Sequence, residues 1–455
     1  MTDPVAFTRR TVDQILDRAG RPDFDRWQQQ LQHCGYCSRP VRLRGRITHR
    51  TPGGRRAVTY STHSEPDGVL LVRCGNRRAS ACPSCSREYA GDMWQLLYAG
   101  AAGGRKGVPE SIRNHPLIFA TLTAPSFGPV HTTREGNRRC HPRPAGAQPQ
   151  RRCQHGRATV CTAVHDHRDP ALGQPLCPNC YSYDAHAAFN WYAPELWRRF
   201  TITLRRTLAH RCRMTPSQFD RRARINFVKV AEFQRRGVVH FHALIRLDGP
   251  DAFTPPGVQV NVDELADAIQ HAARDARLTS DGLSLSFGDQ IDTQPVHGRR
   301  GLTPERVAAY IAKYATKSAD DFGLGDRRIT PDTPLDVSDH IARLLDTCWR
   351  LGEHENYAGL HRWLHILGFR GHFATKSRRY SITLGAIRAE RRAYREAENP
   401  DVVDDSTLVV STWTFVGLGH LTDGDVALAA SAAARARERR ETAREQSVSD
   451  QKGAP

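Results

Sequence analysis

The chain has 455 residues, with 66 Lys and Arg against 48 Asp and Glu, and a formal net charge of +18 at pH 7. This length allows two or three domains with a sizeable core. The charge predicts a polyanionic partner, and the arginines are spread along the chain, which favours nucleic acid over a membrane surface. No apolar run approaches the roughly 18 residues that cross a bilayer, and the N-terminus lacks an apolar signal segment. We therefore expect a soluble, cytoplasmic protein.

Residues 1–115 are expected to form an N-terminal zinc-binding domain that begins with a helix. Two CxxC pairs lie in this region, Cys34 with Cys37 and Cys82 with Cys85. Pairs at this separation are typical of one tetrahedral zinc site, with Cys74 as an alternative ligand. Disulfides are the other interpretation, but they seldom persist in the reducing compartment expected for a chain without a secretory signal.

Residues 116–130 predict a strand that ends in turn residues, and the Arg-, His-, Pro- and Cys-rich segment that follows has little hydrophobic periodicity. We interpret residues 131–198 as an insertion whose fold depends on metal. The predicted ligands of a second zinc are Cys153, Cys161, Cys177 and Cys180, with His155, His165 and His167 as competitors. Cys140 has no evident partner, and Cys212 and Cys348 are interpreted as buried thiols. A helix is expected from Pro194, a residue suited to a first turn.

The stretch "INFVKVAEFQRRGVVHFHALIRLD" predicts a β-hairpin with a three-residue loop and glycine at the position of positive φ. Alternate residues of a strand share a face, so His240 and His242 lie together. Counting outward from the loop pairs Glu232 with His240. Two imidazoles and a carboxylate predict a site for Mg²⁺ or Mn²⁺. The alternative is a half-exposed strand with incidental histidines.

An amphipathic helix is expected near residues 261–276, and a second helix begins at Thr303-Pro304-Glu305. On the second helix, Tyr310, Lys313, Tyr314 and Lys317 fall on one face. That spacing alone is typical of a helix that packs its tyrosines on the core. In a basic protein with a predicted metal site, two hydroxyls and two cations on one face favour phosphodiester chemistry, with all four residues as catalytic candidates.

Residues 321–400 are expected to form a basic C-terminal part of the domain that contains these histidines and tyrosines. Within it, residues 371–396 predict a turn, a short strand and a basic helix, with Lys376, Arg378 and Arg379 as candidate DNA-binding residues. A solvated charged helix is an equally good interpretation. Residues 401–455 predict an extension whose end is an exposed helix running into a disordered tail.

The strand Phe119–Thr123, the His-Phe-His at 240–242 and the YxxKYxxK at 310–317 match, in order, the three motifs of HUH endonucleases. The stretches "RRGVVHFHALIRLDG", "PLCPNCYSYDAHAAFNWYAPELWRRFT" and "GFRGHFATKSRRYS" resemble replication initiators of actinobacterial plasmids and integrative conjugative elements. The resemblance covers residues 30–400. It implies an α+β fold, an HUH-type (ferredoxin/RRM-like) antiparallel sheet with helices packed on it, elaborated here by zinc-binding modules. The endonuclease domain is then 116–320, with the metal histidines on a central strand.

The resemblance also implies a chemistry. Single-stranded or extruded double-stranded origin DNA is nicked by one tyrosine, which keeps the 5′-phosphate, and the second tyrosine later rejoins the strand. The released 3′-hydroxyl is extended by a separate DNA polymerase, and a separate helicase is expected because the sequence lacks a GxxxxGK[ST] loop. Two alternatives stay open: a conjugative relaxase with the same chemistry, and a zinc-containing origin-binding or regulatory protein without nuclease activity.

Overall fold

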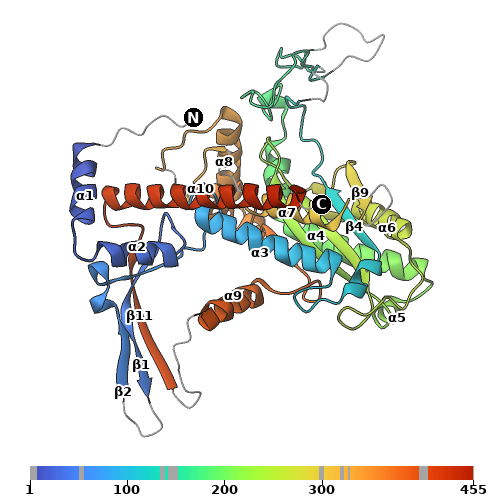
Figure 1. Cartoon of the computed structure of the whole chain (residues 1–455). Coiled ribbons are helices and arrows are strands. Elements are labelled where there is room, and N and C mark those ends of the chain that lie inside the picture. The colour runs from blue at the N-terminus through green and yellow to red at the C-terminus, as the bar shows by residue number, and fades with distance from the viewer. Residues whose placement is uncertain are drawn as a thin grey trace. The chain divides into compact units, whose positions relative to one another are not determined.

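The structure is a computed structural model that describes residues 8–50, 56–133, 139–141, 152–296, 302–317, 322–325, 328–330, 332–398 and 408–453. It is a mixed α/β protein with antiparallel sheets, and the chain divides into two compact units (Figure 1). One unit contains residues 1–91 and 388–455, and the other contains residues 92–387. The divisions fall within α3 (Pro83–Ala102) and α9 (Leu384–Glu398).

The first unit combines the two ends of the chain. Its elements are α1 (Arg9–Ala19), α2 (Phe24–His33), β1 (Val41–Arg50), β2 (Arg56–Ser61), β3 (Leu70–Val72), β11 (Leu408–Leu418) and α10 (Asp423–Gly453). β1 pairs with β2, β3 and β11, and α10 packs on α1. Arg18 fixes that packing, since its guanidinium donates to Asp425 at 2.7 Å and to Asp67 at 2.8 Å.

The division of the chain differs from the one expected from the sequence, where 1–115 formed a domain and 401–455 an extension. β11 adds a strand beside β1, so the C-terminal segment completes the N-terminal unit. The expected C-terminal helix is present as α10. It runs to Gly453, and the last two residues lie outside the described residues.

The second unit is built on a five-stranded antiparallel sheet in the order β10-β5-β6-β4-β9. The strands are β4 (Leu117–Leu122), β5 (Arg224–Phe233), β6 (Val239–Asp248), β9 (Ile291–Pro295) and β10 (Ala374–Lys376), with β7 (Arg277–Ser280) and β8 (Leu283–Ser286) as a separate hairpin. The helices are α4 (Tyr183–Arg211), α5 (Pro216–Asp220), α6 (Val262–Asp275), α7 (Pro304–Ala315) and α8 (Asp339–Leu351). β6, which carries the two histidines, is the central strand.

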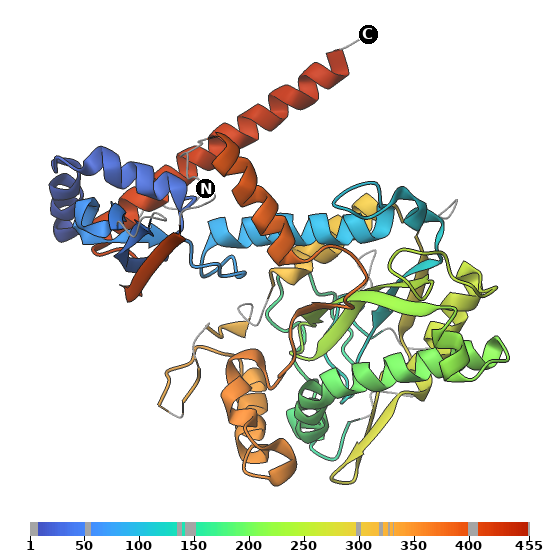
Figure 2. The same cartoon turned by 90° about the horizontal axis from the view of Figure 1, so that it is seen from below.

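The two faces of this sheet are chemically different. On one face Phe241 of β6 packs against Trp197 of α4, with 5.5 Å between ring centroids, within the main apolar core. On the other face Arg246 of β6 donates to the carbonyl oxygen of Gly100 in α3. Gly100 has no room for a side chain, because a Cβ would lie 2.2 Å from the ring of Tyr380. Figure 2 shows α4 and the end of α3 on opposite sides of the sheet.

The β5–β6 hairpin has the register predicted from the sequence. Glu232 pairs with His240, and the Gln234 N–H donates to the Val238 carbonyl oxygen at 2.9 Å. Gly237 has a φ of 82°, a conformation that glycine adopts without a steric penalty. The strand at 117–122, the helix at 262–275 and the short strand and basic helix after residue 371 are also confirmed.

The prediction that a helix begins at Pro194 is wrong. α4 begins at Tyr183 and contains Pro194 in its interior. The preceding turns are held by tertiary contacts, because the buried Asn190 donates to the carbonyl oxygens of Gly237 and Leu367 and accepts from the Val239 N–H. Burial of these turns overrides the local preference of proline for a first turn. Among the described residues no helix is long and apolar enough to cross a membrane.

Candidate functional site

Glu232, His240 and His242 meet on the face of the sheet that α3 and α7 cover. The Nε2 atoms of the two histidines are 2.9 Å apart, and Glu232 Oε2 lies 3.2 Å from His240 Nε2 and 3.3 Å from His242 Nε2. Ligands that occupy neighbouring positions around an octahedral ion at about 2.1 Å are about 3.0 Å apart. The three atoms therefore fit one divalent cation, and a set of three neighbouring ligands leaves further positions open.

The protonation states of this group also suit metal binding. Burial acts to raise the pKa of Glu232, but hydrogen bonds with His240, His242 and Lys317 outweigh it and lower the pKa to about 2. Burial lowers the pKa of His242, more than Glu232 raises it. At neutral pH the site thus offers a carboxylate and a neutral imidazole, the forms that bind metal ions.

Thr121 of β4 holds His242 in position. Its hydroxyl lies 3.1 Å from His242 Nδ1, in line with the cross-strand pairing of these two residues. Nδ1 can donate to the hydroxyl oxygen, which leaves the Nε2 lone pair directed at Glu232 and His240. Thr121 belongs to the motif strand "FATLT", but the sequence alone does not indicate a role for its side chain. The register of β4 against β6, which only the structure supplies, identifies it.

The two tyrosines of α7 lie beside the candidate metal ligands. The ring centroids of Tyr310 and Tyr314 are each 5.3 Å from that of His242 and 4.6 Å from each other. Phe119 of β4 supports Tyr310 edge-on at 5.8 Å. Burial, a hydrogen bond with Tyr314 and the charge of Glu232 raise the pKa of Tyr310. Both tyrosine rings therefore lie beside the same candidate metal ligand, His242.

The two lysines of the motif occupy different places. α7 ends at Ala315, so Lys317 lies just beyond the helix, where its ammonium group donates to Glu232 Oε1 at 3.0 Å and lies 4.6 Å from the ring centroid of Tyr314. Lys313 is exposed, with its ammonium group 6.0 Å from the same centroid. Lys317 therefore contacts both Glu232 and Tyr314, and Lys313 lies at the edge of this group.

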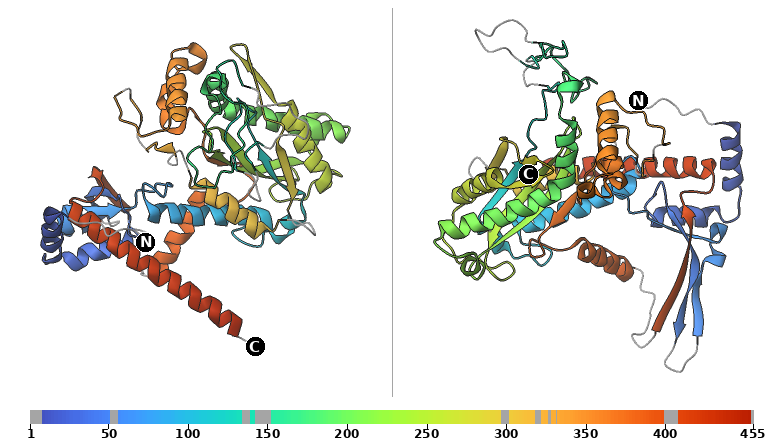
Figure 3. Two further views of the ribbon diagram at one scale, coloured as in Figure 1. Left: turned by 90° about the horizontal axis from the view of Figure 1, so that it is seen from above. Right: turned by 180° about the vertical axis from the view of Figure 1, so that it is seen from behind.

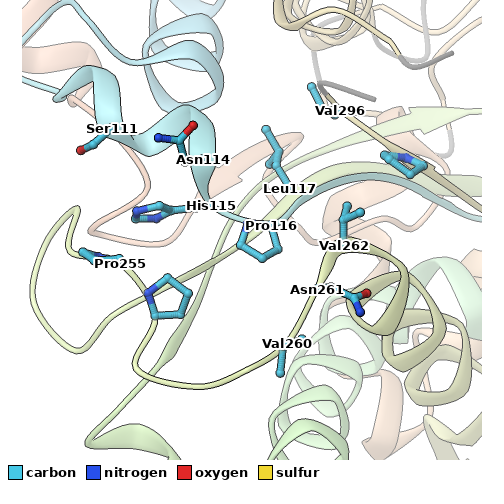
Figure 4. Close-up of a pocket in the computed structure, with 12 residues that line it drawn as sticks. Ser111, Asn114, His115, Pro116, Leu117, Pro255, Val260, Asn261, Val262 and Val296 are labelled. Atoms are coloured by element: carbon cyan, nitrogen blue, oxygen red, sulfur yellow. The ribbon is translucent and has the colours of Figure 1, made fainter. Parts of the chain in front are cut away.

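A cavity of about 830 Å³ opens beside this group and is lined by Glu232, His240 and Lys317, with Arg168 and Arg235 on its walls. A second hollow, of about 630 Å³, lies at the other end of β4 around Leu117 (Figure 4). Prolines and valines line much of that hollow, and its only histidine, His115, is bound to Asp248 at 2.7 Å. The first cavity is therefore the one that suits a phosphate-bearing ligand.

In the first unit four cysteines come together: Cys37, Cys74, Cys82 and Cys85. Three of their sulfur–sulfur distances are 3.7 Å. Sulfurs placed tetrahedrally at about 2.3 Å from a zinc ion are about 3.8 Å apart. Cys74 thus takes the place expected for Cys34. Cys34 is the residue that follows α2, and its thiol donates to the Leu31 carbonyl oxygen at 3.4 Å instead.

The segment between β4 and α4 contains a second group, Cys153, His155, Cys177 and Cys180. His155 Nδ1 lies 3.2 Å from Cys180 Sγ and 3.7 Å from Cys177 Sγ. His155 takes the place expected for Cys161, because a turn in which Gly156 N–H donates to the Cys153 carbonyl oxygen brings the imidazole to the thiols. Cys161 lies instead in a further group with His131, Cys140 and His165. His167 belongs to neither group.

The three basic residues proposed to contact DNA are not equivalent. Arg378 and Arg379 are exposed, and Arg379 donates to the Pro250 carbonyl oxygen. The ammonium group of Lys376 donates to the carbonyl oxygens of Ser377, Arg378 and Ser381, and burial lowers its pKa. Lys376 therefore holds the turn after β10.

Comparison with known proteins identifies the family. The family model described as "Replication initiator protein, pSAM2" matches residues 23–434. The chain belongs to this family of replication initiators. A replication initiator protein of Streptomyces ambofaciens is 41% identical over 464 residues, which covers 97% of this chain and 96% of the relative. No solved structure matches the chain.

Proposed function

We propose that this replication initiator is a metal-dependent HUH endonuclease that starts rolling-circle replication. It would nick one strand of single-stranded or extruded origin DNA and later rejoin it. The observation that carries the proposal is the placement of Tyr310 and Tyr314, each 5.3 Å by ring centroid from His242, on the face where His242 meets His240 and Glu232. The central position of the histidine strand in a five-stranded antiparallel sheet supports an HUH-type fold.

The chemistry is an exchange of phosphodiester bonds. A divalent cation held by Glu232, His240 and His242 would polarise the scissile phosphate and offset its charge. The tyrosine oxygen forms a bond to phosphorus, the bond to the 3′-oxygen breaks, and that oxygen takes up a proton to become a 3′-hydroxyl. The 5′-phosphate stays on the protein as a phosphotyrosine. Rejoining is the reverse attack by a 3′-hydroxyl, so neither step needs ATP.

The surroundings of the tyrosines favour an order of attack. A phenol must lose its proton to attack, and the Lys317 ammonium group 4.6 Å from the Tyr314 ring places positive charge where negative charge develops. Burial, the hydrogen bond with Tyr314 and the negative charge of Glu232 disfavour ionisation of Tyr310. We therefore assign the first cut to Tyr314 and the second to Tyr310.

The cysteine groups would be structural. We propose one zinc at Cys37, Cys74, Cys82 and Cys85 and another at Cys153, His155, Cys177 and Cys180, since both sets have the ligand types and spacings of closed tetrahedral sites. The partners proposed are origin DNA, a DNA polymerase that extends the 3′-hydroxyl, and a separate helicase.

The test uses labelled single-stranded origin DNA with Mn²⁺ or Mg²⁺. His240→Ala and His242→Ala should each abolish nicking while DNA affinity changes little, because affinity comes chiefly from phosphate contacts elsewhere. His271→Ala, which replaces an exposed histidine of α6, is the matched control and should nick normally. Metal-dependent nicking by both His240→Ala and His242→Ala would refute the assignment of these histidines as metal ligands. Specific binding without any cleavage by the wild-type protein would favour an inactive origin-binding protein instead.

A further inference from the structure

The segment between β4 and α4 extends away from the sheet (Figures 1 and 3) and contains a third group of potential ligands, His131, Cys140, Cys161 and His165. Its four ligand atoms all lie within 4.8 Å of one another. His131 Nδ1 is 3.1 Å from His165 Nε2, and His165 Nε2 is 3.4 Å from Cys161 Sγ. Around a tetrahedral zinc, two nitrogens are about 3.3 Å apart and a nitrogen and a sulfur about 3.5 Å apart.

The surroundings of these residues orient them as ligands. His165 Nδ1 lies 2.5 Å from the Asp169 carboxylate, so the ring can donate there and keep Nε2 free to bind. A histidine that binds a metal typically makes this kind of bond with its other nitrogen. The Thr132 N–H donates to Cys140 Sγ at 3.2 Å, a contact that stabilises a thiolate.

The backbone brings the four ligands together from two stretches of chain. The Cys140 N–H donates to the Ala163 carbonyl oxygen at 2.8 Å, and the His141 N–H donates to the Cys161 carbonyl oxygen at 2.8 Å. His131 is paired on both sides, since its N–H donates to the Gln174 carbonyl oxygen and its own carbonyl oxygen accepts from Gly173, each at 2.9 Å.

This segment has very little apolar interior. The buried residues among those described from 128 to 180 are Cys140, Leu172, Gly173, Pro175 and Cys177. A chain that cannot bury apolar surface needs metal ions or other cross-links to hold a fixed fold. One zinc at the group of Cys153 would leave the stretch around His131 and Cys140 without such support.

We infer that His131, Cys140, Cys161 and His165 bind a third zinc ion, which fixes the loop His167–Gln174 as a wall of the cavity beside Glu232 and His240. The loop begins two residues after the ligand His165 and contains Asp169, the hydrogen-bond partner of that ligand. It contacts the β5–β6 hairpin, where Arg235 donates to the His167 carbonyl oxygen at 2.5 Å. Gly173 packs so closely that a Cβ there would lie 2.5 Å from the Arg235 backbone. Residues His167, Asp169 and Gln174 line the same cavity as His240.

The role of this wall in holding DNA rests on the proposed function, whereas the zinc site does not. Zinc should therefore be counted in a His240→Ala/His242→Ala background, where the nuclease site contributes no ion. We expect three zinc ions per chain by elemental analysis after purification without chelator. Adding Cys140→Ser and Cys161→Ser should reduce the count to two, and the control Cys212→Ser should leave three. A count of two in the background protein, with Cys140 and Cys161 both alkylated by a thiol reagent, would overturn the site.

Asp169→Asn tests the site without removing a ligand. In the Asp169→Asn protein, one of the three zinc ions should bind with an affinity about 10- to 100-fold lower than in the parent protein, as measured by competition with a chelator. Equal release would overturn the assignment of His165. Hydrogen exchange should show faster exchange across 167–174 in the Cys140→Ser/Cys161→Ser protein while β5 and β6 stay protected. Unchanged exchange would overturn the link to the cavity wall. If the wild-type protein forms no DNA adduct but the His240→Ala/His242→Ala protein contains three zinc ions per chain, the proposed function fails and the zinc site stands.

Discussion

The hydroxyl of Thr121 lies 3.1 Å from Nδ1 of His242, so β4 orients a proposed metal ligand on the neighbouring strand β6. We predict that Thr121→Val, which keeps the shape of the side chain, weakens binding of Mn²⁺ by about 10- to 100-fold, because the imidazole loses the partner that fixes its ring. Titration of the metal dependence of nicking measures this. Thr279→Val, at an exposed position on β7, is the matched control. Equal metal dependence in both variants would show that Thr121 does not position the ligand.

A second prediction distinguishes Cys74 from Cys34. Cys74→Ser should remove one zinc ion and lower the melting temperature of the N-terminal unit, because structural zinc contributes directly to folding free energy. Cys34→Ser should retain the ion, since the Cys34 thiol donates to the Leu31 carbonyl oxygen rather than joining the sulfur group. Zinc analysis of the two proteins decides between them. Loss of zinc from Cys34→Ser with full retention in Cys74→Ser would restore the quartet expected from the sequence.

A third prediction concerns the turn after β10. We propose that Arg378 and Arg379 contact phosphates and that Lys376 holds the turn. Each phosphate contact adds about 0.7 to 0.9 to the slope of log affinity against log salt. The Arg378→Ala/Arg379→Ala protein should therefore bind with a slope flatter by about 1 to 2, whereas Lys376→Met should keep the slope and lose stability. A wild-type slope in the double variant would place this turn away from DNA.

Lys229 gives a prediction about pH. Its side chain is buried, with the ammonium group 4.4 Å from the ring centroid of Phe241, and burial lowers its pKa to about 7. Between pH 7 and about 10.5 the unfolded chain binds the proton and the folded chain does not, so this lysine makes stability rise with pH in that window. Below pH 7 the full cost of burying the lysine is present.

Lys229→Met should therefore raise the melting temperature, most of all at or below pH 7, and the gain should shrink as the pH approaches 10. Thermal unfolding at pH 6.5 and pH 9.5 measures it. Lys313→Met, which replaces an exposed lysine, should change the melting temperature little at either pH. A gain from Lys229→Met that is independent of pH would contradict the lowered pKa.

The parts of the molecule that follow from local pattern were predictable from the sequence. The loop Arg235–Gly237 and the alternation around it were enough to pair Glu232 with His240, because a short hairpin fixes its own register. The tyrosine helix was predictable from its capping threonine and proline. These elements already contain most of the proposed nuclease site.

Features that depend on distant parts of the chain were not predictable. β11 pairs with β1 across more than 350 residues, and no local signal identifies that partner. The choice of Cys74 over Cys34, and of His155 over Cys161, depends on where turns direct each side chain rather than on spacing. The helix start predicted at Pro194 was wrong because the buried hydrogen bonds of Asn190 stabilise the helical turns that precede this proline.

The central claim is that Tyr314 and Tyr310 attack DNA in turn at one metal site. The single variants Tyr314→Phe and Tyr310→Phe should each still form some covalent adduct in a single turnover, with the greater loss of rate in Tyr314→Phe, and neither should sustain repeated initiation and closure. Tyr394→Phe, at an exposed position on α9, is the control and should behave as wild type.

The most direct measurement is mass spectrometry of the adduct formed with labelled single-stranded origin DNA and Mn²⁺, after denaturation and digestion. We predict a nucleotide attached through its 5′-phosphate to the peptide that contains Tyr314 in the wild-type protein, a shift to Tyr310 in Tyr314→Phe, and no adduct in the double variant. An adduct on any other residue, or one that persists in the Tyr310→Phe/Tyr314→Phe protein, would contradict this account.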